Sequence, residues 1–170
     1  MTDVVSPRSP FNDLAIVQNP GLGAYTIWRF GLGFQSDSER PAPFHLAFLV
    51  LPLVLHRATL DAIISTQMAS GLALFAAKLG KEREKLLAVH ERALILRPLS
   101  LQSIGVGIGT RLLTLDYKGA TVRANETPAK PKRPVVPERL KDLGAGSEKL
   151  GVWFSKLGVP QIATLLRVEF

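Results

Sequence analysis

Residues 99–124, LSLQSIGVGIGTRLLTLDYKGATVRA, constrain the fold of this chain more than any other stretch. Apolar side chains at helical spacing predict a helix over residues 99–111. Residues 113–116 and 120–123 then alternate between apolar and polar side chains, and Gly119 lies in the turn between them, which is typical of a β-hairpin. A helix that leads directly into a two-stranded wing is the closing part of a winged-helix module. Because a lone hairpin is marginal in water, we expect it to pack on helices.

The composition favours one packed, mainly helical domain with an appendage. The chain has 170 residues, of which 46% are hydrophobic, enough for a core and too many for a disordered chain. Aromatic residues make up only 7%, so the core consists mostly of aliphatic side chains. There is no cysteine, which excludes disulfides, thiolate catalysis and cysteine-ligated metal sites. We expect a cytoplasmic protein.

Several further helices are predicted before this stretch. Asn19 and Pro20 form a helix start, and the helix extends over residues 20–35. Its glycines at 21, 23, 31 and 33 each cost roughly 1 kcal/mol relative to alanine, so they indicate close packing against another helix. Other helices are predicted at residues 59–64, 65–79 and 81–97, and the second of them is expected to be interrupted or loosened at Ser70 and Gly71.

The most apolar segment, residues 44–55, is too short to cross a membrane. It has 12 residues and contains Pro52, whereas a spanning helix needs about 20 apolar residues. Its leucine and alanine content favours a buried helix that bends or ends near Pro52. Periodicity alone does not distinguish a helix from a strand here.

The predicted fold is mainly α with a small β-hairpin (α+β): a winged-helix-like helical domain plus a C-terminal helical extension. Prolines at 128, 131, 134 and 137 mark a linker, and GAGS at 144–147 is expected to break the helical extension, which ends in a helix or strand beginning at Pro160. The predicted divisions are an N-terminal arm (1–19), the winged-helix-like domain (20–124), a proline-rich basic linker (125–137) and a C-terminal docking segment (138–170).

The last segment is too short to bury a core of its own. Its large apolar side chains must therefore pack on the first domain or on another protein. The residues predicted to make this docking contact are Trp153, Phe154, Leu165 and Leu166.

No sequence motif of catalysis is present. The chain lacks GxSxG, HExxH and GxxxxGK[ST], and GVGIGT at 105–110 does not fit the dinucleotide-binding pattern. His45 and His56 are eleven residues apart, which is not a metal-binding spacing, and His90 lies at the margin of an apolar stripe. We expect a protein that is not an enzyme and that has no catalytic residue, cofactor or metal.

The positive charge favours an anionic partner. The formal net charge is +7, and basic side chains occur in the wing and in the linker. The linker is either a strap on an anionic surface or a solvated spacer. The candidate nucleic-acid contacts are Arg111, Lys118, Arg123, Lys130, Lys132 and Arg133.

Four stretches carry a family resemblance: NPGLGAYTIWRFGLGF at 19–34, PFHLAFLVLPLVLHRATLDAI at 43–63, LSLQSIGVGIGTRLLTLD at 99–116 and LGVWFSKLGVPQIATLLRV at 150–168. With these, the chain resembles the middle component of three-component ABC-ATPase systems, prokaryotic conflict systems that include Lamassu-type antiphage defence. The resemblance implies an accessory subunit that works with an SMC/Rad50-like ATPase and an effector, often a nuclease. It implies no catalytic residue.

The sequence therefore leads to two alternative functions. The first is a non-catalytic assembly subunit that bridges the ATPase and the effector nuclease, with non-specific DNA contact through its basic residues as an addition. The alternative is a winged-helix DNA-binding transcriptional regulator that places residues 99–111 in the major groove. Against the alternative, Gln102 is the only long polar side chain in that helix before Arg111, and a base-reading helix needs several.

Overall fold

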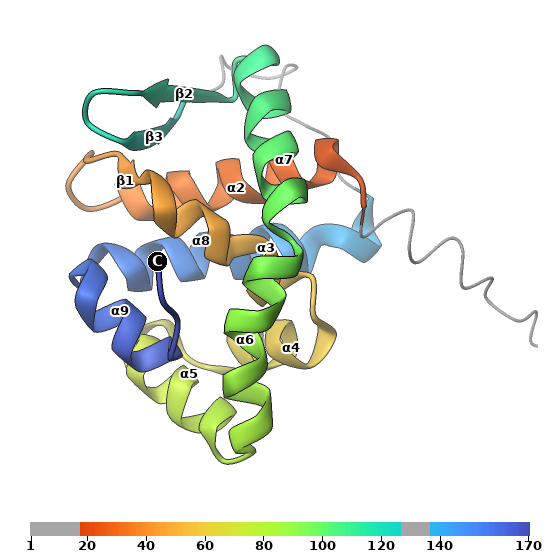
Figure 1. Ribbon diagram of the computed structural model, residues 1–170, viewed down its shortest axis with the longest axis vertical. Helices are drawn as coiled ribbons and strands as arrows, with labels where there is room; N and C mark the ends of the chain where they lie inside the picture. Colours follow the sequence, from red (N-terminus) through yellow and green to blue (C-terminus); the bar gives the residue numbers. More distant parts are fainter. Residues whose placement is uncertain (1–17, 127–136) are drawn as a thin grey trace, which may run out of the picture.

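The computed structural model describes residues 18–126 and 137–170, and the following account concerns these residues. They form a mainly helical fold with one small antiparallel sheet, as predicted (Figure 1). Side chains from both described ranges share one hydrophobic core. Among these residues no single helix is long and apolar enough to span a membrane, and only one pair, Phe44–Val54 with Arg57–Ser65, reaches that length and composition together, across a 101° bend.

Helix α2 (Pro20–Gln35) is the centre of the fold, rather than the helix and hairpin that dominate the sequence. It has the predicted bounds, and Asn19 caps it by accepting hydrogen bonds from the backbone N–H groups of Gly21 and Leu22, at 2.9 and 3.3 Å. Most of its residues are buried, because α7 (Arg97–Gly109) and α8 (Lys141–Ser155) both pack against it.

Glycines allow α2 to approach its neighbours at backbone distance, as predicted. A Cβ atom at Gly33 would overlap the carbonyl group of Glu148, and one at Gly151 would overlap the carbonyl group of Phe30. A Cβ atom at Gly31 would lie 2.7 Å from that of Ala124. These positions therefore exclude every larger residue unless the helices move apart.

The predicted hairpin is present and extends into a three-stranded sheet. Strands β2 (Leu113–Asp116) and β3 (Thr121–Ala124) pair antiparallel, with β3 one residue later than predicted. The short strand β1 (Ala42–Pro43), which the sequence did not indicate, pairs with β3 and gives the order β1-β3-β2. The Gln35 side chain bonds both the N–H and the C=O of Ala124, at 2.7 and 3.0 Å, which fastens the sheet to α2. The winged-helix assignment stays a prediction.

The apolar segment before α4 is helical, as its composition favoured. It begins with a 3-10 helix, η1 (Phe44–Leu49), and continues as α3 (Val50–Val54), which contains Pro52 without a break. Every residue of α3 is buried.

The next helices form the lower part of the molecule in Figure 1. The interruption predicted at Ser70 and Gly71 is present, because a 3-10 turn ends at Ser70 and α5 begins at Gly71, whose φ is +74°. The elements are α4 (Arg57–Ser65), η2 (Met68–Ser70), α5 (Gly71–Gly80) and α6 (Arg83–Ile95).

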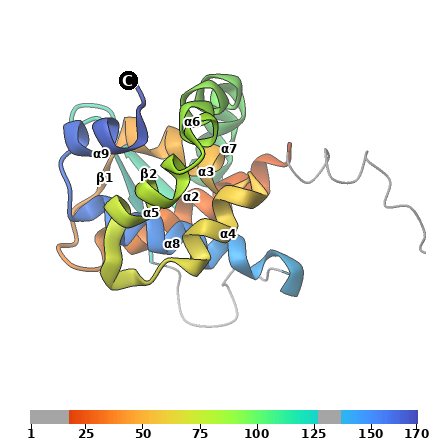
Figure 2. The ribbon, with the colours of Figure 1, turned by 90° about the horizontal axis from the view of Figure 1, so that it is seen from below.

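The C-terminal segment begins with a 3-10 turn, η3 (Glu138–Leu140), and the predicted break at 144–147 is wrong. Helix α8 runs through these residues, because Gly144 lies against the Tyr25 hydroxyl and Gly146 against Leu60, so the glycines make room for packing. The last element is a helix, α9 (Val159–Leu166). In Figure 2, α6, α7 and the C-terminal tail lie on one side of the molecule.

Candidate partner-docking site

Three of the four predicted docking residues lie inside this chain's own core. Trp153, Phe154 and Leu166 are at most 1% exposed, and Leu165 is half-buried. The Trp153 ring stacks on Phe75, with 5.9 Å between ring centroids, and its Nε1–H donates to the carbonyl of Met68 at 2.9 Å. The sequence left open whether these side chains pack on the rest of this chain or on another protein, and the structure shows Trp153, Phe154 and Leu166 packed within this chain.

The predicted nucleic-acid residues that the structure describes lie around the hairpin, and all are exposed. Arg111 precedes β2 with a φ of +64°, Lys118 lies in the turn, and Arg123 donates from Nη1 to the Glu39 carbonyl at 3.1 Å. Asp116 also lies at this edge, where it accepts from the Lys118 N–H. The sheet edge thus carries both signs of charge. The linker candidates Lys130, Lys132 and Arg133 lie outside the described residues.

Beyond Arg97 at its first position, α7 carries no charged side chain. Residues 98–110 contain no acidic or basic side chain. The inward face buries Ser103, Ile104 and Gly107, whereas Leu101 and Ile108 point outward, at 50% and 39% exposure. Exposed apolar side chains that recur on one helix mark a surface for protein contact rather than for reading bases.

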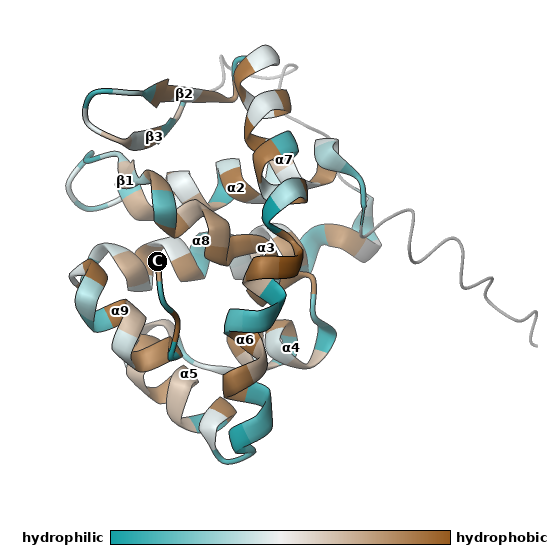
Figure 3. Cartoon of the chain, in the orientation of Figure 1, coloured by the Kyte–Doolittle hydropathy of each residue, from teal (hydrophilic) through white to brown (hydrophobic). Residues whose placement is uncertain are grey.

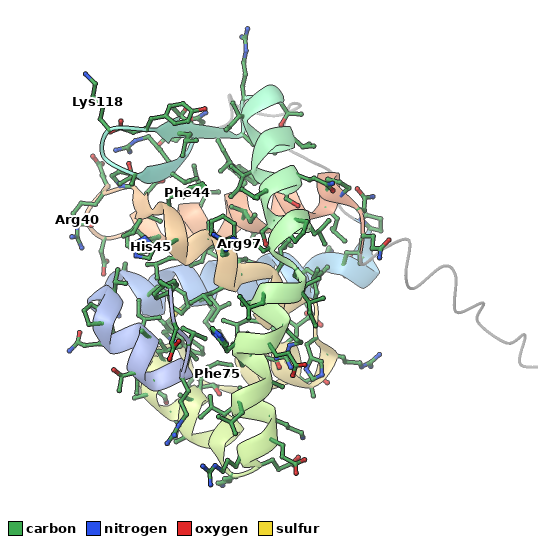
Figure 4. All side chains as sticks on the ribbon, in the orientation of Figure 1. Arg40, Phe44, His45, Phe75, Arg97 and Lys118 are labelled. Atoms are coloured by element: carbon green, nitrogen blue, oxygen red, sulfur yellow. The ribbon has the colours of Figure 1, made fainter. Side chains whose placement is uncertain are left out.

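An apolar groove, here called the tail groove, opens where α6 meets α7 (Figure 4). Its volume is about 330 Å³. Its walls come from η1, from the α6–α7 junction and from the last three residues of the chain. The lining residues are Phe44, His45, Phe48, Leu49, Ala93, Leu94, Arg97, Leu101, Val168, Glu169 and Phe170.

Aromatic contacts and one hydrogen bond fix the walls of the tail groove. The Phe44 and Phe48 rings meet edge to face, with 5.1 Å between centroids. Phe170 meets His45 edge to face at 4.8 Å, and the preceding Glu169 N–H donates to Nδ1 of His90 at 3.3 Å. These contacts hold the C-terminal tail as one side of the groove.

A second groove, here called the wing groove, lies at the other end of α7. It has a volume of about 400 Å³. Asn125 braces its floor, since its side chain donates to the Arg111 carbonyl and accepts from the Thr114 hydroxyl, both at 2.9 Å. The lining residues are Ile108, Arg111, Leu113, Thr114, Leu115, Tyr117 and Asn125. Tyr117 is 84% exposed, so a large aromatic ring stands at the mouth of this groove.

Side-chain hydrogen bonds hold α6 to the core beneath the tail groove. Arg92 donates to the Pro52 carbonyl at 3.1 Å and to the Thr59 hydroxyl at 3.2 Å, and burial lowers the pKa of Arg92. The same hydroxyl lies 2.9 Å from Nδ1 of His56. Burial, together with the charges of Arg92 and Lys85, lowers the pKa of His56, which favours the neutral imidazole.

The described residues hold no arrangement suited to metal-dependent chemistry. No group of three or more histidine or carboxylate side chains in ranges 18–126 and 137–170 could hold a metal ion. His45, His56 and His90 each have a separate neighbour, in Phe170, Thr59 and the Glu169 backbone respectively. What the two grooves offer is apolar contact with a few charged groups at their rims.

Sequence reasoning did not single out the groove residues Arg97 and Phe170. One signal was available in the run of Leu94, Ile95 and Leu96, because three adjacent apolar residues on a helix cannot all face one core. The structure exposes Leu94 at 56% and Ile95 at 67%, so this junction presents an apolar surface (Figure 3).

Comparisons with known proteins give one match. No curated protein and no solved structure matches the chain. A family model described as ABC-three component (ABC-3C) system Middle Component 3 matches residues 10–170, which is nearly the whole chain. The predicted resemblance to a middle component of a three-component ABC-ATPase system is therefore confirmed, and the chain belongs to the Middle Component 3 family of ABC-3C systems.

Proposed function

We propose that this protein is a non-catalytic assembly subunit that bridges an SMC/Rad50-like ATPase and an effector nuclease in an antiphage defence complex. One observation carries the proposal: the apolar tail groove and the wing groove, whose lining is part apolar and part polar, lie at the two ends of α7, with an uncharged exposed helix face between them. Leu101 lines one groove and Ile108 lines the other, seven residues or about 10 Å apart along the helix. Two such surfaces suit contact with two partners.

Co-expression with the other two components of its own system tests the bridge. A tagged copy of this chain should retain both components through size-exclusion chromatography, and the two should separate when this chain is omitted. If the ATPase and the effector remain together without it, the bridging role is wrong.

Groove variants then test whether the two grooves serve different partners. Leu101→Ser alters the tail groove, and Tyr117→Ser alters the wing groove. Both residues are largely exposed, so we expect both variants to fold. Each variant should release one component and keep the other. Leu74→Ser, at an exposed residue of α5 outside both grooves, is the matched control and should retain both.

One observation favours a second function, that of a winged-helix DNA-binding transcriptional regulator. The sheet order β1-β3-β2, with α7 leading into β2, is compatible with the arrangement of a winged-helix module. The uncharged face of α7 opposes this function, because base reading uses polar side chains on that helix. Fluorescence anisotropy with duplex DNA separates the two functions. Tight, sequence-dependent binding by the chain alone favours a regulator. Weak binding that is abolished by salt indicates only non-specific contact with the DNA phosphates.

A further inference from the structure

We infer that the tail groove receives an apolar side chain from an acidic segment of another component of the system, and that a carboxylate of this segment pairs with Arg97. This inference rests on the proposed function and specifies the chemistry of one of its two contacts. Three observations support this inference: the apolar walls of the groove, the absence of an ion pair at Arg97 within the described residues, and the net positive charge of the whole chain.

The walls are those of a site for a protein side chain. Phe44, Phe48 and Leu101 supply aromatic and aliphatic surface, and Phe170, which is 57% exposed, closes one side. Small-molecule sites usually enclose their ligand and orient it with several buried polar groups. In the described part of this groove the charged side chains, Arg97 and Glu169, are both exposed and stand at the rim. An open apolar surface with a charged rim is typical of a protein interface.

Arg97 is prepared to bind a carboxylate. Its guanidinium group lies over the Phe48 ring, 5.8 Å from the centroid, which is the geometry of a cation–π contact. Within the described ranges no ion pair joins Arg97 to an acidic group of this chain. An arginine held against an aromatic ring keeps its hydrogen-bond donors available for bidentate contact with a carboxylate.

The overall charge favours an acidic occupant over a second copy of this chain. With a formal net charge of +7, two copies repel each other as they approach, whereas an acidic segment is attracted. We therefore expect the purified chain to remain monomeric in sedimentation analysis. A dimer that Leu101→Ser dissociates would overturn the inference in favour of self-association.

Charge changes at the rim provide the decisive experiment. The binding of the full-length chain to each of the other two components, purified separately, is measured by isothermal titration at several salt concentrations. Arg97→Glu should weaken binding of one component by about tenfold or more, since it replaces an attractive contact with a repulsive one. Glu169→Gln should strengthen binding of the same component by about two- to fivefold, because it removes a like charge.

Matched controls and outcomes separate the inference from the function it rests on. Arg83→Glu and Glu84→Gln make the same changes at exposed positions of α6 outside the groove, and both should leave binding unchanged. If the wild-type chain binds both components and the groove variants bind as tightly as it does, the inference fails and the bridging function stands. The inference also fails if Arg97→Glu strengthens binding, which indicates a basic occupant. If the wild-type chain binds neither component, the proposed function fails and the inference fails with it.

Discussion

Helices α2 and α7 both contain several glycines and lie against each other, and most of these glycines serve different purposes in the two helices. In α2, a Cβ atom at Gly33 would collide with the backbone of Glu148, and one at Gly31 would collide with the Cβ atom of Ala124. In α7, Gly105 and Gly109 have no neighbour within 4 Å of the position that a Cβ atom would occupy. Glycine thus permits tight internal packing at Gly31, Gly33 and the inward-facing Gly107, and it leaves a smooth exposed surface on the outer side of α7 at Gly105 and Gly109.

This difference divides the molecule into a rigid centre and a contact face. The α2–α8 interface is closed by backbone contact and by an ion pair between Arg29 and Glu148, at 2.6 Å. The exposed side of α6 and α7 instead leaves Leu94 and Ile95 in solvent. A helix whose inner face is fixed can present an apolar outer face without unfolding, as the proposed assembly role requires.

The largest predicted effect is that of a methyl group at the α2–α8 contact. Gly33→Ala should lower the free energy of unfolding by about 2–3 kcal/mol, because the Glu148 carbonyl is backbone and cannot rotate away. Urea denaturation followed by circular dichroism measures this loss. A variant as stable as the wild type would show that α2 and α8 separate at little cost, and the contrast with α7 would disappear.

A smaller loss is expected from the polar part of the same interface. Arg29 donates to Glu148 at 2.6 and 3.0 Å and to the Tyr25 hydroxyl at 2.9 Å. Burial alone lowers the pKa of Arg29, and these partners more than offset it, so that the net shift is upward. Arg29→Met should cost about 1 kcal/mol in thermal unfolding, a value reduced by the partial exposure of the pair.

The control for this change lies on the contact face. Arg97→Met removes an exposed arginine that pairs with no acidic group in the described ranges, and it should leave the melting temperature unchanged. Equal losses for the two variants would contradict the division into a rigid centre and a contact face.

The sign of the glycine effect should reverse on α7. Gly105→Ala adds a methyl group in open space within a helix, so it should raise the free energy of unfolding by about 0.5–1 kcal/mol. If the outer face of α7 meets a partner closely, the same variant should bind that partner more weakly although it folds more stably. Titration calorimetry beside urea denaturation measures both quantities. A destabilised variant would mean that Gly105 is not exposed as described.

Local signals allowed much of the fold to be predicted, and long-range contacts account for the rest. Helix α2 was predicted with its bounds because Asn19 and Pro20 determine its start within two residues. Strand β1 was missed because its two residues are extended only through pairing with Thr121 and Val122, almost 80 residues away. Tertiary packing likewise overrode local propensity at residues 144–147, where glycine predicted a break.

The candidate site was harder to predict than the fold. Trp153 is a large aromatic residue of the kind found at protein interfaces, but here it is buried in the chain's own core. The sequence does not distinguish the two cases, because large apolar side chains occur in both. The tail groove joins η1, the α6–α7 junction and the C-terminal tail, and no short stretch of sequence contains it. Its basic member, Arg97, is recognisable only once Phe48 is known to lie against its guanidinium group.

The smallest predicted effect concerns how α6 is attached, by polar side chains rather than by backbone contact. Thr59 accepts from Arg92 and faces Nδ1 of His56, so its hydroxyl donates to the imidazole only when His56 is neutral. Because burial and nearby positive charges lower the pKa of His56 below its ordinary 6.5, the unfolded chain takes up this proton first as the pH falls. The contribution of His56 to stability is therefore complete above pH 6.5 and is lost as the pH falls through the lower pKa of the folded state.

Replacing His56 should remove this pH dependence. His56→Asn should flatten the part of the stability profile that declines below pH 6.5, measured by thermal unfolding at closely spaced pH values. At pH 8 the difference in stability between the two proteins should be constant, which serves as the internal control. A profile whose decline below pH 6.5 is unchanged in the variant would show that other groups cause it.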